Sequence, residues 1–419
     1  MEIKSNEIKK ERVLLAGVHL GLKNIIEDTT EESIKELYEL VKTAGGEVVA
    51  QVIQNKSELE SGTYMGEGKL EEIRMSIDEL SIDCVVFDDE LSPIQLRNIS
   101  ELLGVKVLDR SMLILDIFAM RAKSGEGKIQ VELAQLKYRL PRLRGLGVVM
   151  SRTGGGIGTR GPGETKLETD RRHIHRRIQA LTEELSELGK HRELLRSRRK
   201  KDGVISVALV GYTNAGKSTL LNALTDANVF AEDKLFATLD PTSRALELED
   251  GRKILLVDTV GFIRKLPHHL VEAFKSTLEE AVVADVLLHV VDISNPEYEN
   301  QIIVVDEVLA DIGADNKPKI TVYNKCDKRE DEIIKSSVSD VFISAKKKEG
   351  LDELMRVIGD TAPGKKQKMK ILVPYSEGSL VSELHNTQKV LSEEYTQEGT
   401  VLVLLADSIT YNKLRNYII

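Results

Sequence analysis

The sequence predicts an α/β protein of four parts: an N-terminal α/β domain, a helical hairpin, a central α/β domain and a small C-terminal α+β domain. Three observations predict it. Strand-like apolar runs alternate with helical patterns over 12–108 and again over 203–362. The stretch between them is highly charged and has only helical periodicity. The length of 419 residues also exceeds what one compact core normally holds.

Composition predicts a soluble, cytoplasmic chain without an integral membrane segment. Hydrophobic residues make up 41% and charged residues 30%, and no apolar run approaches the length of a membrane span. The N-terminal stretch MEIKSNEIKKERVLLAG lacks the apolar core of an export signal. Cys84 and Cys326 lie far apart without metal-ligand spacing, so we expect neither a disulfide framework nor a zinc site. We expect a monomer in a reducing compartment.

The N-terminal domain, 1–110, reads as a parallel α/β unit. Its predicted strands are RVLLAGV, GEVVAQVI, DCVVFDD and VKVLD, and its predicted helices are EESIKELYELVKTAG and KLEEIRMSIDEL. Gly66, Gly68 and Lys69 come directly before the second helix, where free backbone N–H groups can hold a phosphate. The same pattern is also typical of a plain turn and helix start. The sequence leaves both interpretations open.

Two helical seams predict a hairpin over 111–202. The first consists of Ile129, Leu133, Leu136, Leu140 and Leu143, with Pro141 as a candidate bend. The second has nearly heptad spacing and consists of Leu167, Ile174, Ile178, Leu181, Leu185, Leu188 and Leu195. We expect the two helices to pack in antiparallel fashion.

A glycine-rich segment, GLGVVMSRTGGGIGTRGPGETK, separates the two seams. Its glycines cannot support a core and predict an exposed loop, made basic by Arg152, Arg160 and Lys166. The spelling GxGxxG over Gly156–Gly161 lacks a surrounding strand and crossover helix, so a dinucleotide site is not expected. Residues 121–201 hold 21 Lys/Arg against 9 Asp/Glu in a chain of net charge -9. This charge indicates either a solvated helix face or a nucleic-acid contact.

The central domain, 203–362, carries a phosphate-loop motif. VALVGYTNAGKST matches G-x-x-x-x-G-K-[ST] from Gly211 to Ser218, with an apolar strand before it and a helical pattern after it. Gly211 and Gly216 let the backbone N–H groups face a phosphate, Lys217 adds a positive charge, and Ser218 is a ligand for Mg²⁺.

Further motifs follow later strands of this domain. In KILLVDTVGF, Asp258 can organise Mg²⁺ and its waters, and the N–H of Gly261 can approach a γ-phosphate. In KITVYNKCD, Asp327 can accept two hydrogen bonds from guanine, a donor pair that adenine lacks. Thr238 and Thr242 are both candidates for a switch threonine that reaches Mg²⁺.

Taken in order, GYTNAGKST, FATLDPT, DTVGF, NKCD and SAK resemble the guanine-nucleotide motifs of translation-factor-related GTPases. RTGGGIGTRGPGETKLETDRR and TYMGEGKLEEI are similar to segments of HflX proteins in the Obg-HflX group. The resemblance implies a central P-loop GTPase domain whose protein binds GTP or GDP with Mg²⁺, contacts the large ribosomal subunit and its ribosomal RNA through the hairpin, and helps to split or rescue ribosomes.

The resemblance also selects Thr238 over Thr242, and it implies a catalytic set of Lys217, Thr238 and Gly261, with Ser218 and Thr238 holding the metal. The nucleotide-binding residues that it implies are Gly211, Tyr212, Thr213, Asn214, Ala215, Gly216, Lys217, Ser218, Phe236, Ala237, Thr238, Leu239, Asp240, Asp258, Thr259, Val260, Gly261, Asn324, Lys325, Cys326, Asp327, Ser344, Ala345 and Lys346.

Two positions raise questions about the chemistry. Phe262 stands where many small GTPases carry a glutamine that orients water, so we expect slow hydrolysis until the ribosome, another residue or a cation completes the site. Asn214 resembles the asparagine that coordinates K⁺ in some cation-stimulated GTPases, and a structural loop contact is an equal alternative.

Two other functions fit parts of the sequence. One is an ATP-driven RNA remodeller whose ATP site lies around Gly66–Lys69. The other is a scaffold that binds GTP for structure and holds a partner through the hairpin. The remaining stretch, 363–419, reads as a strand, a helix, two strands and a final helix, which predicts the small α+β domain without indicating its use.

Overall fold

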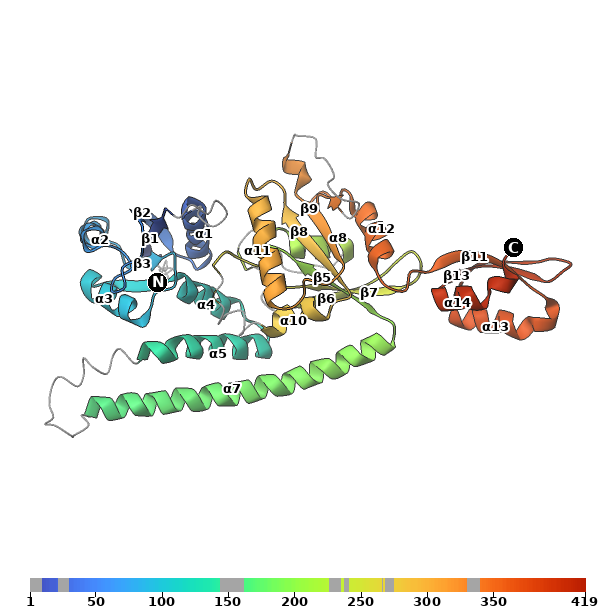
Figure 1. Cartoon of the computed structure of the whole chain (residues 1–419), viewed down its shortest axis with the longest axis horizontal. Coiled ribbons are helices and arrows are strands. Elements are labelled where there is room, and N and C mark those ends of the chain that lie inside the picture. Colours follow the sequence, from blue (N-terminus) through green and yellow to red (C-terminus); the bar gives the residue numbers. More distant parts are fainter. Residues whose placement is uncertain are drawn as a thin grey trace, which may run out of the picture.

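The structure is a computed structural model that describes residues 10–21, 30–143, 162–225, 235–236, 241–265, 267, 275–329 and 340–419. The N-terminal and C-terminal domains lie at opposite ends of the molecule, with the central domain between them (Figure 1). The long helix α7 (Pro162–Lys201) runs beneath the N-terminal and central domains. No helix among the described residues is long and apolar enough to cross a membrane.

The N-terminal domain is a parallel sheet covered by helices on both faces, as predicted. Its strands follow the order β2-β1-β3-β4 and comprise β1 (Arg12–Leu20), β2 (Glu47–Lys56), β3 (Cys84–Phe87) and β4 (Lys106–Asp109). One face packs against α1 (Thr30–Thr43) and α4 (Arg110–Arg121), and the other against α2 (Glu67–Leu80) and α3 (Pro93–Leu103). The helix α3 was not among the predicted helices; it begins with a capping box between Ser92 and Gln95.

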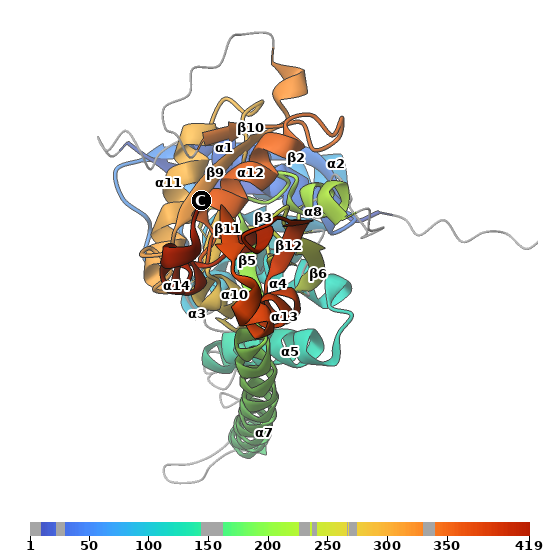
Figure 2. The same ribbon diagram turned by 90° about the vertical axis from the view of Figure 1, so that its right-hand side faces the viewer.

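The hairpin pairs α7 with α5 (Gly125–Arg142), and Figures 1 and 2 show the two helices in contact. The expected antiparallel arrangement is confirmed. Leu181 of the second seam is fully buried, and Arg177 of α7 makes two bonds of 2.7 Å with Glu132 of α5. Pro141 lies inside the last turn of α5, directly before its final residue, Arg142. The glycine-rich segment with Arg152 and Arg160 lies outside the described residues.

The second seam ends earlier than its pattern indicates. Leu195 is 37% exposed because α7 has by then run past the start of α5. There Arg192 still pairs with Glu126 near the beginning of α5, whereas Arg196 pairs with Glu279 and Glu280 of the central domain. Ion pairs therefore replace apolar contacts along the last turns of α7.

The central domain is a six-stranded sheet with the order β10-β9-β8-β5-β7-β6. Its strands are β5 (Ile205–Val210), β6 (Thr242–Glu247), β7 (Lys253–Asp258), β8 (Val286–Asp292), β9 (Lys319–Asn324) and β10 (Asp340–Phe342), and only β6 is antiparallel to its neighbour. On one face lie α10 (Lys275–Val283) and α11 (Tyr298–Asp311), and on the other α8 (Lys217–Thr225) and α12 (Leu351–Thr361). Because the motifs follow parallel strands, they meet at one edge of the sheet.

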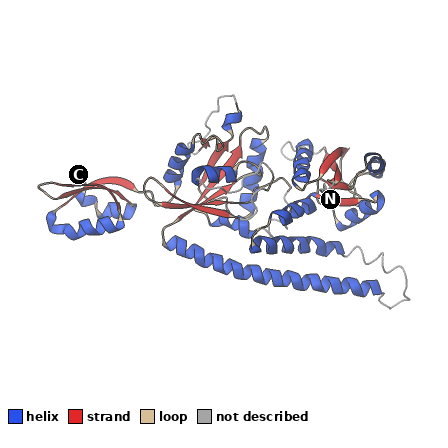
Figure 3. Cartoon of the chain, turned by 180° about the vertical axis from the view of Figure 1, so that it is seen from behind, coloured by secondary structure: helices blue, strands red, loops and turns tan. Residues whose placement is uncertain are grey.

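The C-terminal domain is an antiparallel sheet with the order β11-β13-β12, formed by β11 (Gln367–Val373), β12 (Lys389–Tyr395) and β13 (Thr400–Ala406). Figure 3 shows α13 (Gly378–Thr387) and α14 (Ser408–Lys413) on one face of this sheet. The α+β prediction is confirmed. At the junction, the buried Arg252 donates to the backbone carbonyls of Ala362 and Pro363 at 2.8 and 2.9 Å.

Candidate nucleotide-binding site

The phosphate loop joins β5 to α8, and its two glycines are required by close contacts. Gly211 has a φ of 149°, and a Cβ there would lie 2.2 Å from the carbonyl oxygen of Val290. Gly216 has a φ of 95°, and a Cβ there would lie 2.3 Å from Nδ2 of Asn324. No side chain fits at either position, so the motif glycines permit the close packing of the loop on β8 and β9.

Lys217 is held at the start of α8 by the loop itself. Its Nζ donates to the carbonyl oxygens of Gly211 at 3.0 Å and Tyr212 at 2.9 Å. Burial lowers the pKa of Lys217 to about 8, although the nearby Asp258 partly opposes this shift. An ammonium has three donors, so two bonds orient the group and leave one hydrogen for an anion.

Ser218 and Asp258 meet where a divalent cation would need oxygen ligands. The hydroxyl of Ser218 donates to Oδ2 of Asp258 at 2.6 Å, and the neighbouring Thr259 hydroxyl donates to the carbonyl of Leu209 at 2.7 Å. Among the described residues no group of three or more acidic, His or Cys side chains could hold a metal. The Ser218 hydroxyl and the Asp258 carboxylate are oxygen groups, the ligand type of Mg²⁺, which commonly takes one or two protein oxygens and completes its shell with phosphate and water.

Gly261 lies directly on the phosphate loop. A Cβ there would lie 2.8 Å from Cα of Thr213 and 2.9 Å from Nζ of Lys217. The next residue pairs with the loop through its backbone: Phe262 N–H donates to Gly211 O at 3.1 Å, and Thr213 N–H donates to Phe262 O at 2.8 Å. The structure thus brings Gly261 and Lys217 together, while the Phe262 ring is buried in the core and presents no polar group to a water.

Asn324 links three of the motif loops. Its side chain is 2% exposed; Nδ2 donates to Ala215 O at 2.8 Å, and Oδ1 accepts from Ala345 N–H at 3.0 Å. The adjacent Lys325 donates to the backbone carbonyl of Asn214 at 2.9 Å and to Asp292 at 2.6 Å. Residues separated by more than a hundred positions in sequence are therefore fixed into one cradle.

Asp327 lies at the half-exposed outer end of this cradle. The hydroxyl of Ser344 donates to its Oδ1 at 2.8 Å, and this bond lowers the pKa of Asp327 below its usual value. The carboxylate is therefore ionised at neutral pH and oriented. Lys346 is exposed, and the Cys326 thiol contacts the carbonyl of Tyr323 at 3.3 Å.

Four expected site residues lie outside the described residues, and a fifth, Phe236, has a described contact with the N-terminal domain. Ala237, Thr238, Leu239 and Asp240 belong to the stretch that the structure does not describe. Phe236 is described, and its buried ring packs edge-on against Phe118 of α4, with centroids 4.7 Å apart. The same apolar cluster includes Tyr212 of the phosphate loop and Phe262, so the role of Phe236 in nucleotide binding stays a prediction.

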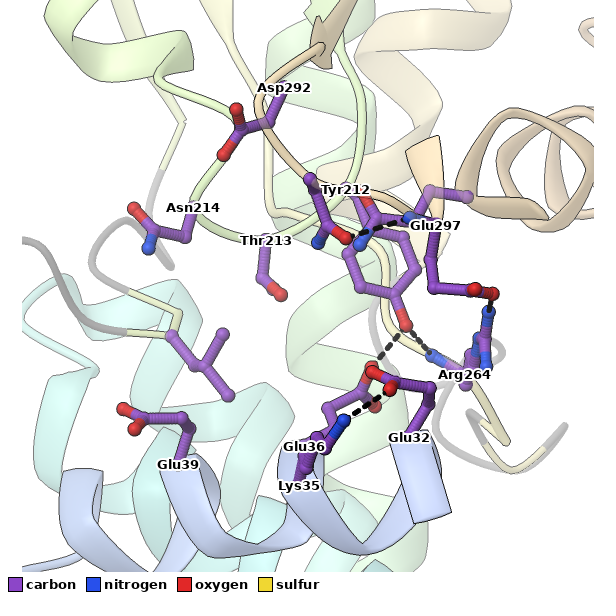
Figure 4. A pocket seen from close by; sticks show the side chains of 13 residues that line it. Glu32, Lys35, Glu36, Glu39, Tyr212, Thr213, Asn214, Arg264, Asp292 and Glu297 are labelled. Carbon is purple, nitrogen blue, oxygen red and sulfur yellow. Dashed lines mark hydrogen bonds and ion pairs between the residues drawn. The ribbon is translucent and has the colours of Figure 1, made fainter. Parts of the chain in front are cut away.

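A second set of residues at this site belongs to none of the sequence motifs. A pocket of about 220 Å³ lies between α1 and the phosphate loop, and its lining includes Glu32, Glu36 and Glu39 of α1 together with Tyr212 and Thr213 (Figure 4). Two hydrogen bonds meet at the Tyr212 hydroxyl, which donates to Glu36 and accepts from the backbone N–H of Arg264 at 2.8 Å. In sequence, Glu36 looks like any solvated helix residue, so no local signal identifies it.

Comparisons with known proteins agree with this geometry. The chain matches three family models in succession: GTP-binding GTPase N-terminal over 31–119, GTP-binding GTPase Middle Region over 121–199, and 50S ribosome-binding GTPase over 206–325.

Proteins named GTPase HflX are similar over nearly the whole chain. The one from Caldanaerobacter subterraneus subsp. tengcongensis is 52% identical over 411 residues, which cover 98% of this chain and 94% of the relative. The one from Lacrimispora saccharolytica is 54% identical over 93% of this chain and 92% of the relative. The one from Escherichia coli K12 is 41% identical over 90% of this chain and 89% of the relative.

Proposed function

Because the chain belongs to the HflX family of GTPases, a ribosome-binding family, we propose that it is a GTP-hydrolysing switch that associates with the large ribosomal subunit and helps to split or rescue ribosomes. The observation that supports nucleotide binding is the pair of hydrogen bonds made by the Asn324 side chain, which joins the phosphate loop to the loops of Asp327 and Ala345. Guanine specificity follows from an oriented, ionised Asp327.

The proposed roles at the phosphate end follow from the contacts around Lys217. Its remaining hydrogen is directed to the β- and γ-phosphates, and the N–H of Gly261 donates to the γ-phosphate. Ser218 and Thr238 supply the protein ligands to Mg²⁺, with Asp258 orienting the Ser218 hydroxyl. Bound Mg²⁺ neutralises phosphate charge as the terminal bond breaks. Thr238 is included among the Mg²⁺ ligands because of the family resemblance.

Two features support slow turnover by the free protein and stimulation by the ribosome. The buried Phe262 ring offers no group to orient a water, so an external group or cation has to complete the site. Asn214 is an exposed residue lining the pocket beside the phosphate loop, an accessible place for a K⁺ ligand. Hydrolysis rates in K⁺ and Na⁺ test this role: equal rates would leave Asn214 as a loop residue.

The hairpin supports RNA as the partner. Arg172 and Arg176 are exposed on α7, which projects along the underside of the body (Figure 2). Arginines that neutralise RNA phosphates release counterions, so the binding affinity should fall steeply as the salt concentration rises. Co-sedimentation with large ribosomal subunits at several salt concentrations tests the proposal, with an Arg172→Glu/Arg176→Glu variant. Arg356→Glu on α12 is the control, because that arginine is 67% exposed and lies away from the hairpin. Equal binding by all three proteins would contradict an RNA-docked hairpin.

The ATP-driven alternative has less support from the N-terminal domain. The backbone N–H of Gly66 already donates to Gln54 at 2.9 Å, and Lys69 pairs with Glu72 at 2.7 Å. Competition between ATP and GTP in an Asp327→Asn variant separates the two sites, because only the guanine site should lose its preference. The scaffold alternative predicts tight GTP binding with no stimulation by ribosomes.

A further inference from the structure

The segment that follows Gly261 crosses from the phosphate loop to the N-terminal domain. Its last described contact is made by Lys265, whose Nζ lies 2.6 Å from Oδ2 of Asp88 and 2.6 Å from Oδ1 of Asp89. Both aspartates follow the carboxyl end of β3. Lys265 has a φ of 53°, a left-handed conformation that a lysine rarely adopts without tertiary contacts to hold it.

A series of buried ion pairs and hydrogen bonds connects this contact to the phosphate loop. Asp88 accepts from Arg110 at 2.7 Å, and the fully buried Arg110 also pairs with Glu36. Glu36 accepts from the Tyr212 hydroxyl, which in turn accepts from the backbone N–H of Arg264 (Figure 4). We call the set of Glu36, Asp88, Asp89, Arg110, Tyr212 and Lys265 the interdomain clamp.

The charges of the interdomain clamp depend on one another. Burial alone would raise the pKa of Asp88, but Arg110 and Lys265 hold it below its usual value. Burial alone would lower the pKa of Lys265, but Asp88 and Asp89 hold it above its usual value. A buried charge that loses its partner is strongly disfavoured, so the two domains are tied at this point while all members are present.

We propose that the interdomain clamp positions Gly261 for the terminal phosphate of GTP, which makes Lys265 a positioning residue through which the N-terminal domain favours GTP over GDP. The inference rests on the proposed function, in which Gly261 contacts only the γ-phosphate. Residues 261–265 are fixed at one end by the backbone pairing of Phe262 with the phosphate loop and at the other by Lys265. Ordering a free segment opposes binding, and a segment already held in place avoids most of that loss.

The test compares the affinities of GDP and of a non-hydrolysable GTP analogue for full-length variants. Lys265→Met should weaken binding of the analogue about tenfold and leave GDP binding unchanged, because several backbone torsions become free. Lys265→Arg should retain most of the preference. Lys319→Met is the matched control: Lys319 is 35% exposed against 40% for Lys265, and it contacts Asp306 at 2.7 and 2.9 Å on the surface.

A double-mutant cycle with Asp89→Asn identifies the interaction itself. If Lys265 acts through this carboxylate, the double variant should lose less GTP-analogue affinity than the two single losses combined. Equal loss of GDP and analogue affinity would overturn the inference. An unchanged ratio of the two affinities in both Lys265→Met and Asp89→Asn would also overturn it. Failure of the wild-type chain to bind guanine nucleotides would instead overturn the proposed function.

Discussion

Removing the Asn324 side chain should loosen the nucleotide cradle more than any single change at its surface. Asn324→Ala leaves Ala215 O and Ala345 N–H without their bonds of 2.8 and 3.0 Å, and both alanines are buried. An unsatisfied buried group costs about 1–3 kcal/mol, so the two together cost about 2–6 kcal/mol. We expect part of this loss in the stability of the free protein and part in nucleotide affinity.

Urea unfolding without nucleotide and GDP titration by fluorescence measure the two parts. Asn324→Ala should lower the unfolding free energy by about 2 kcal/mol or more and weaken GDP binding at least about tenfold. Asn98→Ala is the control, because Asn98 lies in the N-terminal domain, where Nδ2 donates to Gly62 O at 3.0 Å and Oδ1 accepts from its neighbour Arg97, so its loss should leave GDP affinity unchanged. A change below about 0.5 kcal/mol, with GDP affinity unaltered, would refute the reasoning.

Three further changes have defined outcomes. Because the pKa of Lys217 is about 8, raising the pH from about 7 to about 9 should remove most of its charge and weaken GDP binding about tenfold. GDP titrations at both pH values check this, and the Lys217→Met variant should lack the pH dependence. Gly211→Ala should destabilise the protein by about 3 kcal/mol in thermal unfolding, since its Cβ would lie 2.2 Å from Val290 O. Arg252→Met should cost about 2–4 kcal/mol in urea unfolding, because carbonyls of Gly359, Ala362 and Pro363 lose a charged donor, while GDP affinity stays unchanged at the opposite edge of the sheet.

The fold and the convergence of the motifs could be predicted from sequence because both have local signals. Apolar strands give the sheets, and motifs that follow parallel strands must share an edge, as Lys217, Asp258 and Asn324 do. The hairpin followed from two periodic seams. The helix α3 was missed, although Ser92, Pro93 and Gln95 carry a typical start signal, because only its beginning is strongly marked.

The interdomain contacts could not be predicted, because charge pairing across domains has no periodic signal. Tyr212 and Glu36 are 176 positions apart, and Lys265 and Asp88 are 177 apart. The edge-on contact of the Phe236 ring with Phe118 had no local signal either, and the role of Phe236 in the nucleotide motif stays a prediction. The domain boundary at 110/111 stays a prediction; it falls after the first residue of α4, and α4 packs on α1 and β3 of the N-terminal domain.

The proposed function makes this chain a GTPase that the large ribosomal subunit stimulates. GTP hydrolysis measured with and without purified large subunits, at several salt concentrations, is the decisive experiment. We expect slow turnover by the free protein, because Phe262 cannot orient a water, and strong stimulation that fades as salt screens the basic hairpin. Rapid turnover without ribosomes, or tight GTP binding with no stimulation at any salt concentration, would contradict it.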